Sequence, residues 1–204
     1  LDRKYALSAQ IPAAERPVVF IGPYEHHSNE LPWRESIADV VTIHENADGH
    51  IDMVHLEAEL IRFAARPLKI GSFSAASNVT GILTDTKAIT ALLHAHDALA
   101  FWDYAAAAPY IDIDASGEDA IFISPHKFIG GPQTPGVLIA KKRLFTNRVP
   151  SVPGGGTVAY VNETEHRYLA DTEHREEGGT PAIIESVRAG LVFQLKEAVG
   201  VELI

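Results

Sequence analysis

Cysteine is absent from the 204 residues, so the chain can form no disulfide, no thiolate metal site and no cysteine nucleophile of its own. Basic residues are scarce as well, because 17 Lys and Arg face 27 Asp and Glu, and the formal net charge is −10. The phosphate backbone of a nucleic acid binds to clustered Lys and Arg. We therefore expect no nucleic acid partner and interpret the spread-out acidic surplus as a solvated surface.

Long apolar runs are also missing. No run approaches the roughly 20 residues that a membrane span needs, so we expect no membrane partner. The first ten residues, LDRKYALSAQ, lack the apolar core of a signal peptide. These absences favour a cytoplasmic protein. Because the sequence does not begin with Met, we expect it to be part of a longer chain.

The composition is that of a globular domain, with 46% hydrophobic residues. Short apolar runs alternate with helical patterns, which predicts a three-layer α/β/α fold with a mainly parallel sheet. A loop alone separates the last two runs, so that pair could be antiparallel. The predicted strands are Pro17–Ile21, Val40–Ile43, Leu68–Phe73, Leu99–Trp102, Ala120–Ile123 and Gly136–Ile139.

Three helices are predicted from apolar residues that recur every three or four positions. One begins near Met53, and a second includes Ile89 and could be capped by Asp85 or Thr84. In the third, Thr180 suits the N-cap and Pro181 the first helical position. Its apolar face would consist of Ile184, Val187, Leu191, Leu195 and Val199.

The domain organisation that we expect is a single domain. Residues 1–150 form its core, and residues 151–204 add a Gly/Pro-rich loop and the last helix.

Polar side chains follow four of the predicted strands. His26 and His27 follow the first, Asn78 the third, Asp103 the fourth, and His126 with Lys127 the fifth. Ligands of parallel sheets bind beyond the carboxyl ends of the strands, so we expect these groups to line one site.

The residue types at these strand ends indicate the chemistry of the site. A lysine that is partly desolvated can attack a carbonyl group. An aspartate can hold a pyridinium nitrogen, an imidazole can stack on an aromatic ring, and an asparagine amide can donate to a phenolate oxygen. Taken singly, a surface Lys or a turn-forming Asp is the ordinary interpretation. Together the groups favour pyridoxal 5'-phosphate (PLP) as cofactor.

Several segments, in this order, resemble the class V aminotransferase family, which includes cysteine desulfurases and selenocysteine lyases. They are EHHSN (25–29), SNVTG (77–81), the Asp of FWDYAAA (101–107), SPHKFIGGPQTPGVLI (124–139) and EEGGTPAIIES (176–186). The resemblance implies the major domain of a PLP-dependent aminotransferase. It also implies a transferase or lyase that acts on a small amino acid through a lysine Schiff base.

The resemblance assigns the catalytic roles to two residues. Lys127 would form the Schiff base with PLP and then shuttle the substrate proton. His26 would stack on the PLP ring and assist proton transfer. Asp103 would pair with the pyridinium nitrogen, and Asn78 would contact the ring oxygen. The family usually has Gln where this chain has Ala106, so Ala106 cannot share that contact.

The phosphate of PLP would be bound by Ser124 and His126. Thr180 would reach the phosphate of the neighbouring subunit, which implies a homodimer. A Thr at a helix N-terminus suits an anion, although a simple N-cap remains the alternative.

Two parts of the family pattern are missing. Nothing between Leu1 and Tyr24 matches the early Gly/Thr loop that contacts the phosphate, and we expect the small C-terminal domain of the family to lie outside these residues. We therefore expect a central fragment that is inactive by itself and binds PLP weakly or not at all. Desulfuration, transamination and elimination all stay open as the reaction.

Other functions fit less well. Ten histidines suggest a metal hydrolase, but there is no HExxH, and residues at i and i+2 of a helix, such as His94 and His96, do not share a face. A dinucleotide site would need G-x-G-x-x-G between a strand and a helix, which is absent. A degenerate, non-catalytic member of the family stays open, although retention of Lys127, Asp103 and His26 together argues against it.

Overall fold

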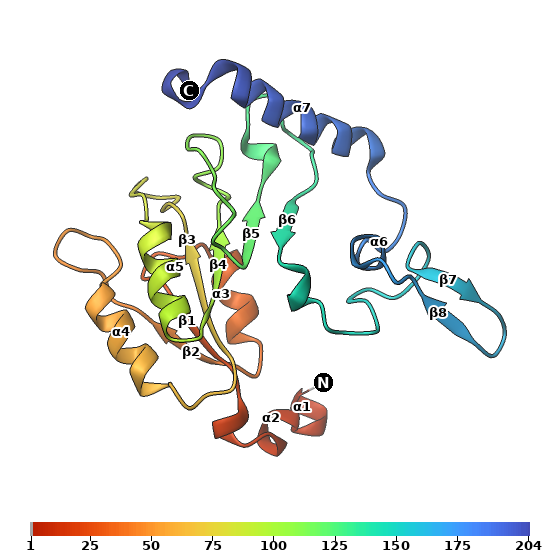
Figure 1. Cartoon of the computed structure of the whole chain (residues 1–204), viewed down its shortest axis with the longest axis horizontal. Coiled ribbons are helices and arrows are strands. Elements are labelled where there is room, and N and C mark those ends of the chain that lie inside the picture. Colours follow the sequence, from red (N-terminus) through yellow and green to blue (C-terminus); the bar gives the residue numbers. More distant parts are fainter. Residues whose placement is uncertain (1) are drawn as a thin grey trace.

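A six-stranded sheet forms the centre of the computed structural model, which describes residues 2–204 (Figure 1). The strand order is β2-β1-β3-β4-β5-β6, parallel throughout except for β6, which runs antiparallel to β5. The mainly parallel sheet and its antiparallel last pair are thus confirmed. The strands are β1 (Val18–Ile21), β2 (Asp39–Thr42), β3 (Lys69–Ser74), β4 (Leu99–Asp103), β5 (Ala120–Ile123) and β6 (Val137–Ala140).

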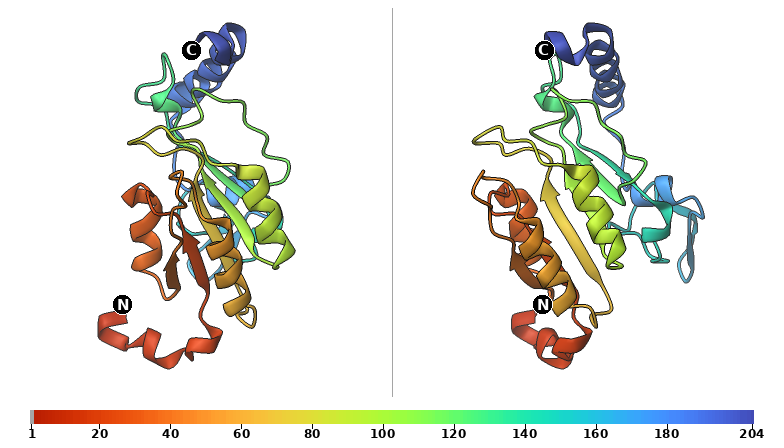
Figure 2. Two further views of the ribbon diagram at one scale, coloured as in Figure 1. Left: turned by 90° about the vertical axis from the view of Figure 1, so that its left-hand side faces the viewer. Right: turned by 60° about the vertical axis from the view of Figure 1, so that its left-hand side comes forward.

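Helices cover both faces of the sheet, as Figure 2 shows. On one face lie α4 (Met53–Arg62) and α5 (Thr86–Ala95), and on the other lies α3 (His27–Arg34). Asp85 caps α5 as predicted, since its carboxylate accepts from the Ala88 N–H at 3.0 Å. Two short helices, α1 (Asp2–Tyr5) and α2 (Leu7–Gln10), precede the sheet.

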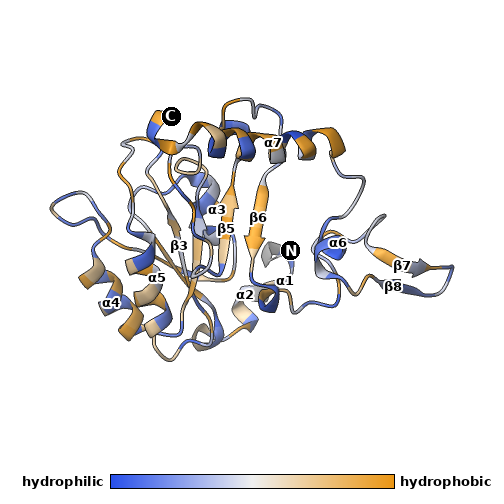
Figure 3. Cartoon of the chain, turned by 45° about the horizontal axis from the view of Figure 1, so that its top comes forward, coloured by the Kyte–Doolittle hydropathy of each residue, from blue (hydrophilic) through white to orange (hydrophobic). Residues whose placement is uncertain are grey.

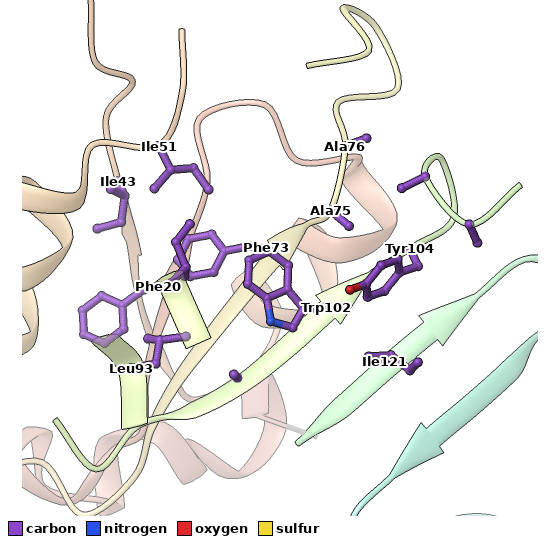
Figure 4. Packing of buried hydrophobic residues seen from close by; sticks show 14 of the residues in the cluster. Phe20, Ile43, Ile51, Phe73, Ala75, Ala76, Leu93, Trp102, Tyr104 and Ile121 are labelled. Carbon is purple, nitrogen blue, oxygen red and sulfur yellow. The ribbon is translucent and has the colours of Figure 1, made fainter. Parts of the chain in front are cut away.

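The larger part of the core lies between the sheet and the α4–α5 face. Phe20, Phe73 and Trp102 are fully buried there and come from three neighbouring strands (Figure 4). Gly71 lets α5 approach the sheet closely, because a Cβ at this position would lie 2.5 Å from a methyl group of Leu93. This packing holds the strands rigidly, so their carboxyl ends can position side chains precisely.

The last quarter of the chain leaves the sheet. It contains a hairpin, β7 (Val158–Val161) and β8 (His166–Tyr168), followed by α6 (Thr172–Glu176) and α7 (Ile183–Val199). The prediction that Thr180 caps the last helix is wrong. Ala182 occupies the cap position, because Gly179 donates its N–H to Gly155 at 2.8 Å and holds the chain in a loop up to that point.

The apolar face predicted for α7 exists, but it faces outward. Figure 3 shows apolar residues along the helix, which crosses the carboxyl edge of the sheet. The five residues of this face are 37–79% exposed, while α7 buries Ala189 and Val192. Within the described part of the chain, no helix has the length and apolar character needed to cross a membrane.

Candidate cofactor site

A cleft of about 650 Å³ opens at the carboxyl edge of the sheet, next to α3. Six of the seven residues predicted for the site line it: His26, Asn78, Asp103, Ser124, His126 and Lys127. They come from four segments that are distant in sequence. The volume falls within the usual range for small-molecule sites, about 300–1,000 Å³.

His26 stands where β1 leads into α3. It is the N-cap of the helix, and its Nδ1 accepts a hydrogen bond from the Ser28 N–H at 3.2 Å. This contact assigns the proton of the neutral ring to Nε2. The ring is half-buried and packs on His27, with 4.0 Å between the ring centroids. The imidazole of His26 therefore forms one wall of the cleft in a fixed orientation.

Asp103 is the last residue of β4, where the strand ends at the cleft. One carboxylate oxygen accepts from the Ala105 N–H at 2.8 Å, which fixes the side chain. Among the described residues, no protein group donates to the other oxygen. A half-buried carboxylate with one oxygen left free can bind a cationic ring nitrogen.

Asn78 lies in a tight loop after β3. The Ser77 hydroxyl accepts from the N–H groups of Val79 and Thr80, and the Gly81 N–H donates to the Ser77 carbonyl at 2.9 Å. Gly81 has φ +75°, which a residue with a side chain adopts only with strain. The loop is thus held by its own hydrogen bonds, and the Asn78 amide is left exposed at the cleft.

Lys127 ends a single 3-10 turn, η2 (Pro125–Lys127), that follows β5. The turn is closed by hydrogen bonds from the Lys127 N–H to Ser124 and from the Phe128 N–H to Pro125, both 3.0 Å long. The chain then folds back so tightly that a Cβ on Gly131 would lie 1.9 Å from the Pro125 oxygen. Local backbone geometry, rather than side-chain contacts, therefore positions Lys127.

The Lys127 side chain is exposed, and so is that of His126. Partial desolvation of Lys127, expected from its place at a strand end, is therefore not found in this chain. The physical reason is that the side chain follows a turn at the rim of the cleft, where it also borders a second, smaller hollow beneath α7.

α7 connects the Lys127 turn to the loop that follows Asp103. The ring of Phe193 packs edge-on against Phe128 at 5.0 Å, and the Lys196 ammonium donates to the Ala108 carbonyl at 2.8 Å. Burial lowers the pKa of Lys196. One helix thus ties together two of the segments that line the cleft.

Thr180 is the predicted site residue that does not line the cleft. It is exposed, and it lies on the segment between α6 and α7. Its predicted role, contact with the phosphate in a neighbouring subunit, stays a prediction.

Sequence reasoning missed the part of the cleft that α3 provides. Ser28, Asn29 and Trp33 line it together with Ser74 at the end of β3. The helix was not predicted because Pro32 lies inside it and because the histidine pair was treated as part of a strand-end loop. The available signal was the spacing of Asn29 and Trp33, which lie four residues apart and therefore fall on one helical face.

The histidines do not gather into a metal site. Among the residues that the structure describes, no three His, Asp or Glu side chains are arranged to hold a metal ion. His94 instead contacts the buried Asp119 at 2.8 Å, and His96 lies 3.8 Å from Glu57. These pairings account for the two histidines of the H-x-H sequence.

Solved structures with this fold include cysteine desulfurases. The apo structure of a cysteine desulfurase from Thermococcus onnurineus NA1 superposes with a TM-score of 0.80 at 22% identity, over 96% of this chain and 48% of that one. The cysteine desulfurase CsdA from Escherichia coli gives a TM-score of 0.79 at 25% identity, over 97% of this chain and 49% of that one. The α/β/α fold of the PLP-dependent aminotransferase type is thereby confirmed.

Sequence comparison leads to the same family. A protein described as a probable cysteine desulfurase from Halalkalibacterium halodurans is 30% identical over 195 residues, which is 90% of this chain and 45% of that protein. A cysteine desulfurase from Synechococcus elongatus is 29% identical over 188 residues, or 88% of this chain and 29% of that one. The chain thus spans less than half the length of these relatives. The model of the family described as Aminotransferase class-V matches residues 5–204, and the chain therefore belongs to that family.

Proposed function

We propose that this chain provides the PLP-binding core of an enzyme that acts on a small amino acid, with cysteine as the substrate. One observation carries the proposal: groups suited to each part of PLP come from four separate segments and meet in one cleft. The relatives described as cysteine desulfurases support the choice of substrate.

The residues present fit PLP. The free oxygen of Asp103 suits the ring nitrogen, and the His26 imidazole offers a flat face for the ring. The exposed amide of Asn78 suits the phenolate oxygen, while Ser124 and His126 suit the phosphate. When bound, PLP supplies an electron-poor ring that weakens the bonds at the α-carbon of an amino acid.

In this proposal the residues have distinct tasks. The Lys127 Nζ would hold the cofactor covalently, and as a free amine it would accept the proton from the substrate α-carbon. Asp103 keeps the ring nitrogen protonated by its negative charge. His26 limits the movement of the ring and excludes water from one side of it.

Sulfur transfer would need a thiol acceptor. These 204 residues contain no cysteine, so the thiol would come from outside them. An added dithiol would take the sulfur from cysteine as a persulfide and then reduce it to sulfide, forming its own disulfide. Release of alanine and sulfide under these conditions would support desulfuration. Keto acid formation with amino transfer would support transamination instead.

Chemical trapping tests the cofactor proposal. The purified chain is incubated with PLP at high concentration, reduced with borohydride and mapped by peptide mass spectrometry. We expect the pyridoxyl group on Lys127, and its loss in Lys127→Ala. Asp103→Asn should label much less, while Asp112→Asn, an exposed carboxylate outside the cleft, should label like the unchanged chain. Labelling spread over the surface lysines would contradict the proposal.

We also propose that the active form is a homodimer in which Thr180 contacts the phosphate bound by the other subunit. The exposure of Thr180 and its position outside its own cleft support this. The test mixes Thr180→Ala chains with Lys127→Ala chains. In a mixed dimer, the Thr180→Ala chain supplies Lys127 and the Lys127→Ala chain supplies Thr180, so one cleft has both residues. The amount of PLP trapped on Lys127 should therefore exceed the amount trapped in Thr180→Ala chains alone. No rise on mixing, with dimers present by sedimentation, would exclude the assignment.

A further inference from the structure

Next to His26 in sequence, the half-buried Glu25 accepts four hydrogen bonds with its carboxylate. One oxygen accepts from the N–H groups of Gly22, at 3.1 Å, and Ser74, at 3.0 Å. The other accepts from the Ser74 hydroxyl at 2.7 Å and the Asn29 amide at 2.8 Å. All four partners are donors, which is the arrangement that an ionised carboxylate satisfies and that no neutral side chain of the same shape does.

The donors belong to three different elements. Gly22 follows β1, Ser74 ends β3, and Asn29 lies in the first turn of α3. Asn29 is bonded in turn to β3, because its Oδ1 accepts from the Ser72 hydroxyl at 2.7 Å. The Glu25 carboxylate therefore fixes where α3 begins relative to β1 and β3.

The contact with Gly22 is especially close. A Cβ on Gly22 would lie 2.6 Å from the Glu25 carboxylate oxygen, so a residue with a side chain would displace the carboxylate. The turn from β1 to α3 thus closes directly on Glu25, and His26 is the next residue and the N-cap of the helix.

On the other side, Ser74 links this arrangement to Asp103. The two residues are register partners across the parallel pair β3–β4, and both line the cleft. We infer that Glu25 is a positioning residue that sets the His26 imidazole in place relative to the Asp103 carboxylate. The part of this inference that concerns the cofactor rests on the proposed function, whereas the placement of His26 does not.

Glu25 does not itself line the cleft. Burial raises its pKa, although the hydrogen bonds from Ser74 and Asn29 oppose this effect. Its action on the site therefore passes through the backbone that it holds and not through contact with a ligand.

The experiment compares Glu25→Gln and Glu25→Ala with Glu30→Gln. Glu30 lies in the first turn of α3, close to Glu25 in sequence, and pairs with Arg34, so this control removes a carboxylate from the same region without touching β1 or β3. The Gln variant keeps the shape of the side chain but loses acceptor capacity, and the Ala variant removes every contact. Thermal unfolding of each variant gives the folded fraction at the temperature used.

The first measurement is the ¹⁵N spectrum of the His26 ring in the chain without PLP. In the unchanged chain and in Glu30→Gln we expect an unprotonated Nδ1 that accepts from Ser28. In both Glu25 variants we expect the averaged signals of a ring that exchanges between tautomers. Unchanged His26 signals in folded Glu25→Ala would overturn the inference.

The second measurement is PLP affinity, corrected for the folded fraction. We expect it to fall about tenfold in Glu25→Gln and further in Glu25→Ala, since unpaired buried donors relax the site. Corrected affinities equal to that of the unchanged chain would show a purely stabilising role and overturn the inference. If the unchanged chain shows no measurable PLP affinity, borohydride trapping at high PLP concentration decides the proposed function, and the His26 spectrum alone decides the positioning role.

Discussion

Gly131 lies so close to Pro125 that a Cβ on the glycine would come within 1.9 Å of the proline carbonyl oxygen. The close approach brings the chain back across the turn that ends at Lys127. The Thr134 hydroxyl then donates to the Gly131 carbonyl at 2.7 Å and holds the returning segment. The position of the candidate Schiff-base lysine thus depends on a residue that has no side chain.

Replacing Gly131 by Ala should therefore open this turn. We expect the free energy of unfolding to fall by about 2 kcal/mol or more, because the methyl group collides with backbone that cannot move freely. Trapping of PLP at Lys127 should fall as well. Gly117→Ala is the control, since nothing lies within 4 Å of a Cβ there. Urea unfolding gives the free energy of unfolding of both variants. Equal urea midpoints for Gly131→Ala and Gly117→Ala would contradict the expected collision.

Asp119 makes stability depend on acid pH. Its fully buried carboxylate accepts from the Ala100 N–H at 3.0 Å, contacts His94 at 2.8 Å and pairs with Arg143. Burial alone would raise the pKa of Asp119, but these partners lower it to about 2, from 3.8. The carboxylate therefore stabilises the fold above about pH 4, and this contribution is lost as the pH falls toward 2.

The expected size of the acid effect is about 2 kcal/mol, since one pKa unit corresponds to about 1.4 kcal/mol. Unfolding free energies measured between pH 2 and pH 6 should rise less steeply in Asp119→Asn than in the unchanged chain. Asp48→Asn, which alters an exposed carboxylate, should keep the original slope. If the unfolding free energy of Asp119→Asn rises with pH as steeply as that of the unchanged chain, groups other than Asp119 cause the loss of stability in acid.

Trp102 and Thr90 form a buried polar pair inside the apolar core. The indole N–H donates to the Thr90 hydroxyl at 2.9 Å, and Trp102 has no exposed surface. Thr90→Val keeps the volume but removes the acceptor, so we expect a loss of about 1–3 kcal/mol of unfolding free energy. Thr90→Ser keeps the hydroxyl and should lose less. If Thr90→Val and Thr90→Ser both unfold at the same urea concentration as the unchanged chain, the hydrogen bond between Trp102 and Thr90 does not stabilise the fold.

The sequence allowed the sheet to be predicted well because each strand is a short apolar run that ends in polar residues. All six predicted runs overlap β1 to β6, and the site residues at their carboxyl ends meet as parallel strands require. The spacing of apolar residues did not predict the elements that bury few apolar side chains. α3 contains Pro32 and has few apolar residues, and the mostly exposed β7–β8 hairpin directly follows a Pro/Gly-rich stretch that predicts a loop.

Three differences between prediction and structure depend on features that sequence spacing does not reveal. Thr180 and Pro181 match the start of a helix, but the Gly179–Gly155 hydrogen bond delays α7 until Ile183. The motif EHHSN gives no sign of what Glu25 does, because its role follows from its hydrogen-bond donors, and Ser74 lies 49 residues away. Lys127 was expected to be partly desolvated, whereas in this chain it lies exposed at the rim of the cleft.

Two glycines of α7 should respond to alanine with opposite signs. Gly190 lies within the helix, and nothing lies within 4 Å of a Cβ at this position, so Gly190→Ala should add about 0.5–1 kcal/mol through helix propensity. Gly200 ends the helix at φ +83°, where a side chain is strained, so Gly200→Ala should cost about 1 kcal/mol.

Urea unfolding at several protein concentrations tests this pair of changes. The opposite signs should hold at every concentration if the exposed apolar face of α7 packs against nothing in solution. Gly190→Ala could instead destabilise the chain, by an amount that grows with protein concentration. That result would place Gly190 in a contact between copies of the chain, because the added methyl group would interfere with close packing there. In that case the apolar residues of α7, from Ile184 to Val199, would be buried on association.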